Sequence, residues 1–232
     1  KEYRMSQTQQ YVDHESDKWF DRNTKTARNC FTEYLVSLFP RKTLAELDVA
    51  EVGIGRGGNL LYLQNFVKSI HGYDGSKKAV DHCSEFIRLI GAEEKMKTQQ
   101  LNACGTFDIP FTYDMVIYGF LAYMIPENEL IQMRKNMLQI LKKDGYIFIY
   151  DFLSKENLEK PDAYNPHLNV YKRNLSFWTN HFEGFDLVDF RLFDNDHQAA
   201  CLLQDSPSFI DTECTADDKN WAFSALFKRS SL

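Results

Sequence analysis

The chain has 232 residues, a formal net charge of −6 and 44% hydrophobic residues, which suit one globular domain with a sizeable core. The acidic balance argues against a nucleic-acid ligand, and five scattered cysteines without a Cys-x-x-Cys pair argue against a disulfide framework or a zinc site. With no visible signal peptide and no apolar run as long as a membrane span, we expect a cytoplasmic protein that does not bind membranes.

The N-terminal part of the chain precedes the first expected strand and has helical character. Apolar residues recur at helical spacing from Thr24 to Phe39, and Pro40 marks the end of that helix. Before it stands Trp19-Phe-Asp-Arg-Asn23, which supplies an aromatic ring and a guanidinium group. A helical segment is therefore expected over residues 1–45, followed by a main domain over residues 46–232.

A glycine-rich turn organises the main domain. The stretch Glu51-Val-Gly-Ile-Gly-Arg-Gly-Gly-Asn59 follows a short apolar strand and opens into a helix. Glycines let the backbone turn sharply and approach a ligand closely, and the start of a helix presents N–H groups. Asp74 ends the next expected strand, roughly twenty residues later, where a carboxylate can accept hydrogen bonds from ribose hydroxyls.

The rest of the chain alternates strands with helices, which predicts a parallel sheet with helices on both faces. Strands are expected over residues 67–73, 97–101, 113–120 and 146–152, with helices over 77–90 and from Pro126, and a turn at 142–145. A polar connection at 153–172 and a short helix at 175–182 follow. Two alternating strands, 185–193 and 221–227, joined by a long loop at 194–220, are expected to close the sheet as an antiparallel pair.

The glycine turn is also compatible with a nicotinamide dinucleotide, because Gly53, Gly55 and Gly58 have the spacing of a dinucleotide-binding fingerprint. A short-chain dehydrogenase needs a Tyr-x-x-x-Lys pair on a later helix, and the only such spacing here, Tyr73 to Lys77, stands at the end of a strand. A nicotinamide ligand is therefore disfavoured.

The chain resembles the class I methyltransferases, which use S-adenosylmethionine. The resemblance rests on the glycine turn, on Asp74, on the strand Tyr113-Asp-Met-Val-Ile-Tyr-Gly-Phe120 and on Leu141-Lys-Lys-Asp-Gly-Tyr-Ile-Phe-Ile149. It implies a Rossmann-like, seven-stranded α/β fold, S-adenosyl-L-methionine as cofactor and S-adenosyl-L-homocysteine as product. The residues it assigns to the cofactor are Trp19, Arg22, Glu51, Gly53, Gly55, Gly57, Asn59, Asp74, Gly75, Asn102 and Tyr118.

A narrower resemblance concerns the N-terminal element. Trp19-Phe-x-Arg-Asn23 is similar to an element of methyltransferases found with bacterial sugar and surface-polysaccharide genes. There the element helps to cover the cofactor, which implies that residues 1–45 form a cover and that Arg22 pairs with the methionine carboxylate. Residues 153–172 and 194–220 are then expected to be lid-like insertions that define the substrate.

Methyl transfer to a hydroxyl or ammonium group also requires removal of a proton. The candidates for this catalytic role are His167, Asp151 and Tyr118, each with a structural role as the alternative. No metal is expected, because the acidic ligands of catechol-type methyltransferases are replaced by Tyr118-Gly and Asp151-Phe.

We therefore predict methyl transfer to an oxygen, or less readily a nitrogen, of a small metabolite or nucleotide-linked sugar. A protein methyltransferase and a catalytically silent binding or scaffold protein are the alternatives. The expected partner is the small-molecule or sugar substrate rather than nucleic acid, and a homodimer is compatible with the sequence.

Overall fold

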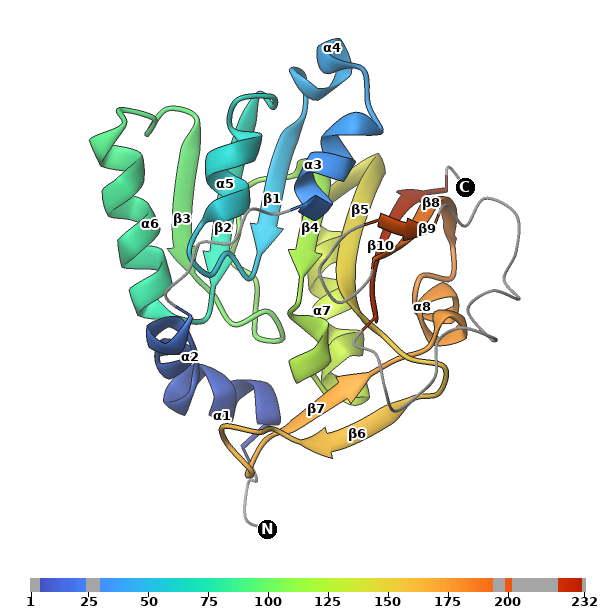
Figure 1. Cartoon of the computed structure of the whole chain (residues 1–232). Coiled ribbons are helices and arrows are strands. Elements are labelled where there is room, and N and C mark those ends of the chain that lie inside the picture. Colours follow the sequence, from blue (N-terminus) through green and yellow to red (C-terminus); the bar gives the residue numbers. More distant parts are fainter. Residues whose placement is uncertain (1–4, 24–29, 194–198, 202–220, 231–232) are drawn as a thin grey trace.

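The computed structural model describes residues 5–23, 30–193, 199–201 and 221–230. Its centre is an eight-stranded sheet in the order β3-β2-β1-β4-β5-β10-β8-β9 (Figure 1). The strands are β1 (Asp48–Val52), β2 (Ser69–Asp74), β3 (Met96–Gln100), β4 (Tyr113–Gly119), β5 (Leu141–Leu153), β8 (Phe185–Phe193), β9 (Ala199–Cys201) and β10 (Trp221–Arg229).

Strands β1 to β5 run parallel to one another, whereas β10 runs antiparallel to both β5 and β8. Without the short edge strand β9, this is the seven-stranded, mostly parallel sheet closed by an antiparallel pair that the sequence predicts. The carboxyl ends of the five parallel strands meet at one edge of the sheet, where the glycine turn follows β1.

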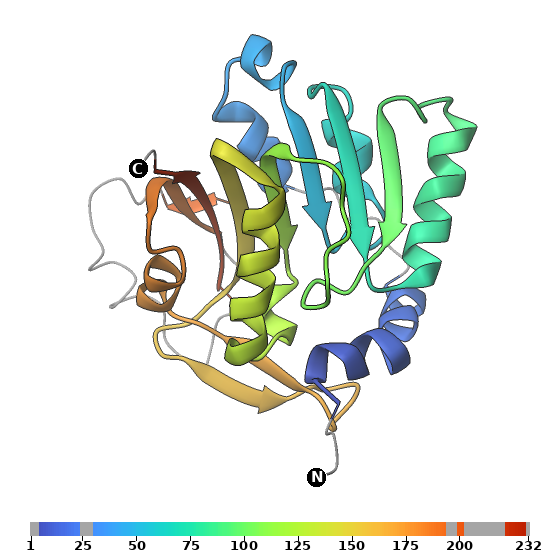
Figure 2. The ribbon, with the colours of Figure 1, turned by 180° about the vertical axis from the view of Figure 1, so that it is seen from behind.

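Helices cover both faces of the sheet (Figures 1 and 2). Buried side chains of α3 (Cys30–Ser37), α5 (Gly58–Leu63) and α6 (Lys77–Leu89) pack on one face. On the other face pack α7 (Glu127–Ile140) and the C-terminal part of the chain around α8 (Leu175–His181). The sheet is thus buried on both sides, as its nearly continuous apolar strands require.

The remaining short elements lie mostly at the carboxyl edge of the sheet. Helices α1 (Gln7–His14) and α2 (Ser16–Arg22), the 3-10 turn η1 (Ala122–Met124) and the hairpin of β6 (Leu158–Pro161) and β7 (Asn169–Lys172) all lie there, whereas α4 (Arg41–Leu44) lies at the opposite edge (Figure 1). No helix in the described ranges is long and apolar enough to cross a membrane.

Sequence signals explain several boundaries. The side chain of Ser76 accepts a hydrogen bond from the backbone N–H of Ala79 and so caps α6, which ends just before Gly91 at a φ of +65°. Pro126 occupies the N-cap position of α7, where its missing N–H costs nothing. The expected start of each helix is confirmed, and so is the end of α6 just before Gly91.

Two expectations about irregular segments are wrong. Residues 153–172 are not a plain connection, because β6 and β7 pair within them as a two-stranded antiparallel sheet. Residues 142–145 lie within β5 rather than before it. The turn is present as an irregularity, since Asp144 has a φ of +60° and the pairing with β4 shifts between Tyr113 and Met115.

Two further expectations lie partly outside the described residues. Of the helix expected over residues 24–39, the structure describes α3 from Cys30 to Ser37. Of the loop expected at 194–220, it describes only β9, which pairs with β8.

We predict that truncation of Phe148, a core residue, strongly lowers the free energy of unfolding. This side chain is fully buried in β5, opposite Leu226 of β10. Phe148→Ala should lower the free energy of unfolding by about 3–5 kcal/mol, because a cavity remains where the ring was. Urea unfolding measures this loss, with Ile131→Ala on the exposed side of α7 as the control. Equal losses in the two variants would contradict this view of the core.

Candidate functional site

The turn after β1 adopts a backbone that favours glycine. Gly53, Gly55 and Gly57 have φ values of +87°, +50° and +75°, in the left-handed region. A Cβ at Gly57 would lie 2.7 Å from the Sγ of Cys83, and one at Gly55 would lie 3.4 Å from the ring of Trp19. Gly57 therefore packs the turn onto α6, and Gly55 lets Trp19 approach the turn.

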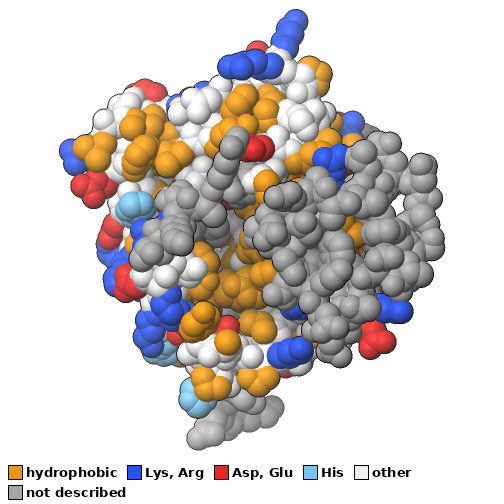
Figure 3. Space-filling model, in the orientation of Figure 1, with side chains coloured by type: hydrophobic (Ala, Val, Ile, Leu, Met, Phe, Trp, Pro, Cys, Tyr) orange, Lys and Arg blue, Asp and Glu red, His pale blue; other side chains and the backbone are white. Residues whose placement is uncertain are grey.

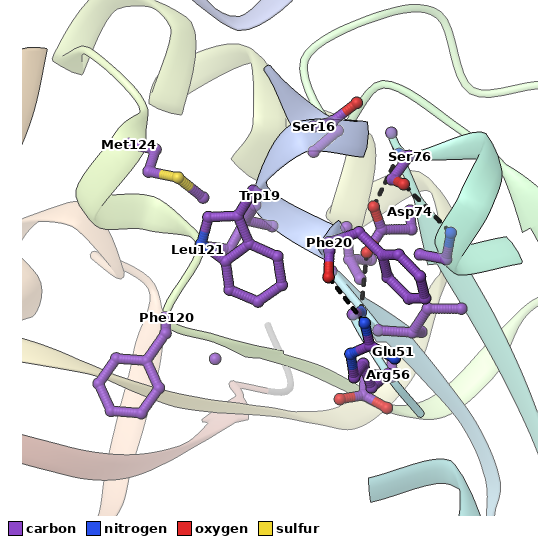
Figure 4. Close-up of a pocket in the computed structure, with 18 of the residues that line it drawn as sticks. Ser16, Trp19, Phe20, Glu51, Arg56, Asp74, Ser76, Phe120, Leu121 and Met124 are labelled. Atoms are coloured by element: carbon purple, nitrogen blue, oxygen red, sulfur yellow. Dashed lines mark hydrogen bonds between the residues drawn. The ribbon is translucent and has the colours of Figure 1, made fainter. Parts of the chain in front are cut away.

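A cavity of about 300 Å³ lies at the carboxyl edge of β1, β2 and β4, beside this turn (Figure 4). Hydrophobic side chains gather near the centre of this side of the molecule (Figure 3). The predicted cofactor residues that line the cavity are Trp19, Glu51, Gly53, Gly55, Asn59, Asp74 and Gly75. The structure thus brings together side chains from the N-terminal helices and from the ends of two strands.

Glu51, in β1, places a buried carboxylate in the cavity wall, with 2% of the residue exposed. Its Oε1 accepts a hydrogen bond from the Nδ2 of Asn59 at 2.5 Å, whereas its Oε2 is buried without a partner. Burial raises the pKa of Glu51 to about 8, against the opposing effect of the Asn59 hydrogen bond. A buried oxygen without a donor marks a place for a ligand that can donate one.

Asn59 is held in turn by two other side chains. Its Oδ1 accepts a hydrogen bond from the Oγ1 of Thr32 at 2.8 Å, and its Nδ2 also donates to the hydroxyl of Tyr150 at 2.6 Å. Tyr150 lies opposite Gly119 in the sheet, so close that a Cβ on Gly119 would come within 1.8 Å of the ring. Asn59 lines the cavity, but its amide serves to fix the orientation of Glu51.

Asp74 holds the glycine turn from the end of β2. Its Oδ2 accepts a hydrogen bond from the backbone N–H of Gly55 at 2.9 Å, and its Oδ1 accepts one from the N–H of Ser76 at 2.8 Å. Burial raises the pKa of Asp74. A carboxylate oxygen can accept more than one hydrogen bond, so this group can also bind hydroxyls of a ligand in the cavity.

The N-terminal helices are attached to the turn through Arg56. Its Nη2 donates to the backbone carbonyl of Phe20 at 2.9 Å, its Nε donates to the carbonyl of Asn23, and its guanidinium lies 4.1 Å from the ring centroid of Phe20. In the middle of α2, the ring of Trp19 lies against Gly55. The glycine turn and the wall opposite it are therefore held together.

Four residues assigned to the cofactor do not line the cavity. The side chain of Arg22 donates to Glu15 at 2.5 Å and lies over the ring of Tyr164. Asn102 donates to the Oε1 of Gln9 at 2.9 Å. Gly57 is the N-cap of α5, and Tyr118, the fourth, is buried in the core.

The three candidate proton acceptors also lie outside the cavity wall. Tyr118 is buried in the core on the α7 side of the sheet. Asp151 is buried, and its two carboxylate oxygens accept hydrogen bonds from the backbone N–H groups of Tyr123 and Phe152. His167 is exposed after β6. The structure gathers none of these three side chains at the cavity.

The sequence reasoning missed the contribution of the first helix. Thr8, Tyr11 and Val12 line the cavity from α1, and Ser16 continues the wall in α2. Together with the buried Glu15, their spacing of three or four residues is that of one face of a helix, a signal that polar residues around them obscured. Further lining residues, which the sequence analysis did not assign to the cofactor, include Phe20, Arg56, Ser76, Leu101, Ala103, Phe120, Leu121, Met124 and Tyr150.

Metal-binding groups were also sought in the part of the chain that the structure describes. Among those residues, no group of three or more His, Cys, Asp or Glu side chains could hold a metal ion.

Residues 49–145 match the family model described as methyltransferase domain, which spans β1 to the start of β5 and includes the whole glycine turn. The chain is an enzyme, and residues 49–145 are similar to a methyltransferase domain. No curated protein sequence matches it. The family implies S-adenosylmethionine as the cofactor.

Solved structures show the same fold at low sequence identity. YcgJ from Bacillus subtilis is 17% identical with a TM-score of 0.61, covering 88% of this chain and all of its own. TehB from Haemophilus influenzae is 13% identical with a TM-score of 0.63, covering 93% of this chain and 67% of its own. An S-adenosylmethionine-dependent methyltransferase from Mesorhizobium loti is 12% identical with a TM-score of 0.60, covering 85% and 96%. The Rossmann-like methyltransferase fold predicted from the sequence is confirmed.

The cavity of this methyltransferase domain fits the cofactor that the family implies. The Oε2 of Glu51 lacks a donor, and an ammonium group such as that of S-adenosylmethionine supplies one. Asp74 offers acceptors for ribose hydroxyls, and the left-handed glycines keep side chains out of the space between them.

The raised pKa of Glu51 predicts a pH-dependent effect of Glu51→Gln on stability. In the free folded protein the carboxyl keeps its proton up to a pH of about 8, whereas in the unfolded chain it loses the proton near its ordinary value of 4.5. Folding of the unmodified chain is therefore penalised increasingly as the pH rises from 4.5 to 8, by at most about 1.4 kcal/mol per pH unit.

Glu51→Gln removes this penalty and should gain stability relative to the unmodified chain across that interval. Urea unfolding between pH 5 and pH 9 without ligand measures the difference. Glu94→Gln, at an exposed position, is the control and should show no such trend. A Glu51→Gln difference that does not change with pH would contradict the assignment of a buried, proton-holding carboxyl.

Proposed function

We propose that this enzyme uses S-adenosylmethionine to methylate an oxygen, or less readily a nitrogen, of a small metabolite or nucleotide-linked sugar. The observation that carries the proposal is the pair of carboxyl groups, the buried Glu51 and the partly buried Asp74, on either side of a glycine turn within one cavity. One carboxyl group suits an ammonium group and the other suits ribose hydroxyls. S-adenosylmethionine carries both, the first on its amino-acid part and the second on its sugar.

Each part of the cavity has a distinct task in this proposal. Bound S-adenosylmethionine supplies an electrophilic methyl group. Glu51 holds the amino end, because Asn59 fixes its other oxygen, and Asp74 holds the ribose while keeping Gly55 in place. Trp19 covers the glycine turn, so that water is kept away from the bound group.

The wall formed after β4 suits the side of the cavity where an acceptor approaches. Phe120, Leu121 and Met124 form it, and Phe120 lies at the end of the cavity away from Asp74 and Ser76 (Figure 4). These side chains are apolar, so they exclude water and orient the acceptor rather than exchange protons with it. Alignment is the main contribution that an in-line methyl transfer needs from the protein.

The cover over the cavity favours a small acceptor over a protein side chain. Helix α1 is attached to η1 and β7 through Gln7, whose Nε2 donates to the carbonyls of Met124 at 3.0 Å and Asn169 at 2.8 Å. Glu129 accepts hydrogen bonds from the N–H groups of Gln7 and Thr8 at the start of α1. A helix fixed in this way restricts access by a folded protein. The cover expected over residues 1–45 is thus formed by α1 and α2, whereas α4 lies at the opposite edge of the sheet.

The proposal predicts that Asp74→Ala weakens the binding of S-adenosylhomocysteine by about 100-fold, because a hydrogen bond to a charged group contributes roughly 1.5–3 kcal/mol and the turn loses its acceptor. Gly55→Val should also abolish binding, since a branched side chain is strained at a φ of +50° and would press on Trp19. Isothermal titration calorimetry measures both. Asp81→Ala, on the exposed side of α6, is the control and should bind normally.

Three outcomes would contradict the proposal. Binding of NAD but not of S-adenosylhomocysteine by the unmodified chain would overturn the cofactor. Transfer of a labelled methyl group from S-adenosylmethionine to the protein retentate of an ultrafiltered cell extract, and not to the low-molecular-mass filtrate, would overturn the small acceptor. Cofactor binding without transfer to either fraction would favour a silent binding protein.

A further inference from the structure

The segment that connects β4 to α7 forms the apolar wall of the cavity and has an unusual backbone. Phe120 has a φ of +47°, in the left-handed region that a bulky residue rarely adopts. Gly119, Phe120, Leu121 and Met124 all line the cavity from this segment. A backbone in such a conformation persists only where the surrounding structure holds it.

Asp151 holds the segment from the end of β5. The residue is 1% exposed, and its Oδ2 accepts a hydrogen bond from the backbone N–H of Tyr123 at 3.0 Å. Its Oδ1 accepts one from the N–H of Phe152 at 2.7 Å. Both oxygens are thus engaged by backbone groups, and Asp151 does not reach the cavity wall.

Arg173 also holds this segment, through two of its backbone carbonyl groups. It follows β7 directly, is 4% exposed, and donates from Nη1 to the carbonyl of Ala122 at 2.7 Å and from Nη2 to the carbonyl of Ile125 at 2.5 Å. The rings of Tyr171 and Phe177 lie about 5 Å from the guanidinium and limit its movement. The planar fork of Arg is suited to binding two carbonyl groups at once.

The two side chains have opposite charges but bind the turn rather than each other. Both belong to the described part of the chain, and no direct ion pair joins them. One holds an N–H group and the other holds two carbonyl groups of residues 122–125. Burial raises the pKa of Asp151 to about 7 and lowers that of Arg173, whereas the backbone hydrogen bonds to Asp151 and the attraction between the two groups favour their charged forms.

We infer that Asp151 and Arg173 are positioning residues that jointly fix the 120–125 segment, and through it the apolar wall of the cavity. This assigns Asp151 a role different from that of a proton acceptor. The inference rests on the proposed function, because it takes S-adenosylhomocysteine as the ligand whose binding depends on that wall.

Asp151→Asn and Arg173→Gln should each weaken the binding of S-adenosylhomocysteine by about tenfold, the loss expected for one charge-assisted hydrogen bond. Because both act on one turn, the double variant should lose little more than either single variant, rather than the hundredfold of independent effects. Titration calorimetry measures the four affinities. Arg173→Lys keeps the charge but not the fork and should recover only part of the loss.

Tyr113→Phe is the matched control for a stability effect without a positioning effect. It removes buried hydrogen bonds to His71 and Tyr73 near the other end of β4, away from the cavity. It should lower the unfolding midpoint without changing the affinity for S-adenosylhomocysteine. If Arg173→Gln does not fold, Arg173→Lys serves in its place, with faster hydrogen exchange at the Tyr123 amide as the second expected sign.

The possible failures are distinguishable. If the unmodified chain does not bind S-adenosylhomocysteine, the proposed function is wrong. If the unmodified chain binds it, and the folded Asp151 and Arg173 variants bind equally well or their losses are fully additive, the shared positioning role is wrong. An affinity loss of the same size in Tyr113→Phe would also overturn it.

Discussion

The burial of the Glu51 carboxylate is the constraint on which the rest of the site depends. A carboxylate removed from water is costly unless hydrogen bonds compensate it, and here protein donors satisfy only one of its oxygens. The compensation involves Asn59, Thr32 and Tyr150, which come from α5, α3 and β5. Three separate elements thus contribute to fixing one side chain, and the Oε2 of Glu51 is left for a ligand.

The same principle operates at two other acids near the cavity, the partly buried Asp74 and the buried Asp151. Asp74 uses backbone N–H groups of the glycine turn and of the start of α6, so that one carboxylate both shapes the turn and faces the cavity. Asp151 uses backbone N–H groups after β4 and β5. Three of the five parallel strands, β1, β2 and β5, thus carry an acid near this edge (Glu51, Asp74 and Asp151) that organises the loop beside it. The loops, rather than the strands, then form the walls of the cavity.

The parts of the site that the sequence predicts are those determined by local spacing. The glycine turn and Asp74 belong to one strand-turn-helix-strand unit, and their conformation follows from residues close in the sequence. Asn59 and Tyr150 are 91 residues apart, and their hydrogen bond depends on how α5 packs beside β5, which no local pattern contains. Tyr118 of β4 pairs with Ile149, the residue before Tyr150 in β5, and successive side chains of a strand face opposite sides of a sheet. Tyr118 therefore lies in the core on one side of the sheet, while Tyr150 faces the other. The hairpin at 153–172 was missed because β6 is mostly exposed and lacks the apolar alternation that indicates a strand.

A crystal structure of the enzyme with S-adenosylhomocysteine tests the central claim most directly. The account predicts that the ligand occupies the cavity beside the glycine turn, with its amino group within hydrogen-bond distance of the Oε2 of Glu51 and its ribose hydroxyls on Asp74. The carboxylate of Glu51 should keep the hydrogen bond to Asn59 that holds it in the free enzyme. A ligand bound elsewhere, or one bound in the cavity with the Oε2 of Glu51 still lacking a donor, would contradict the account.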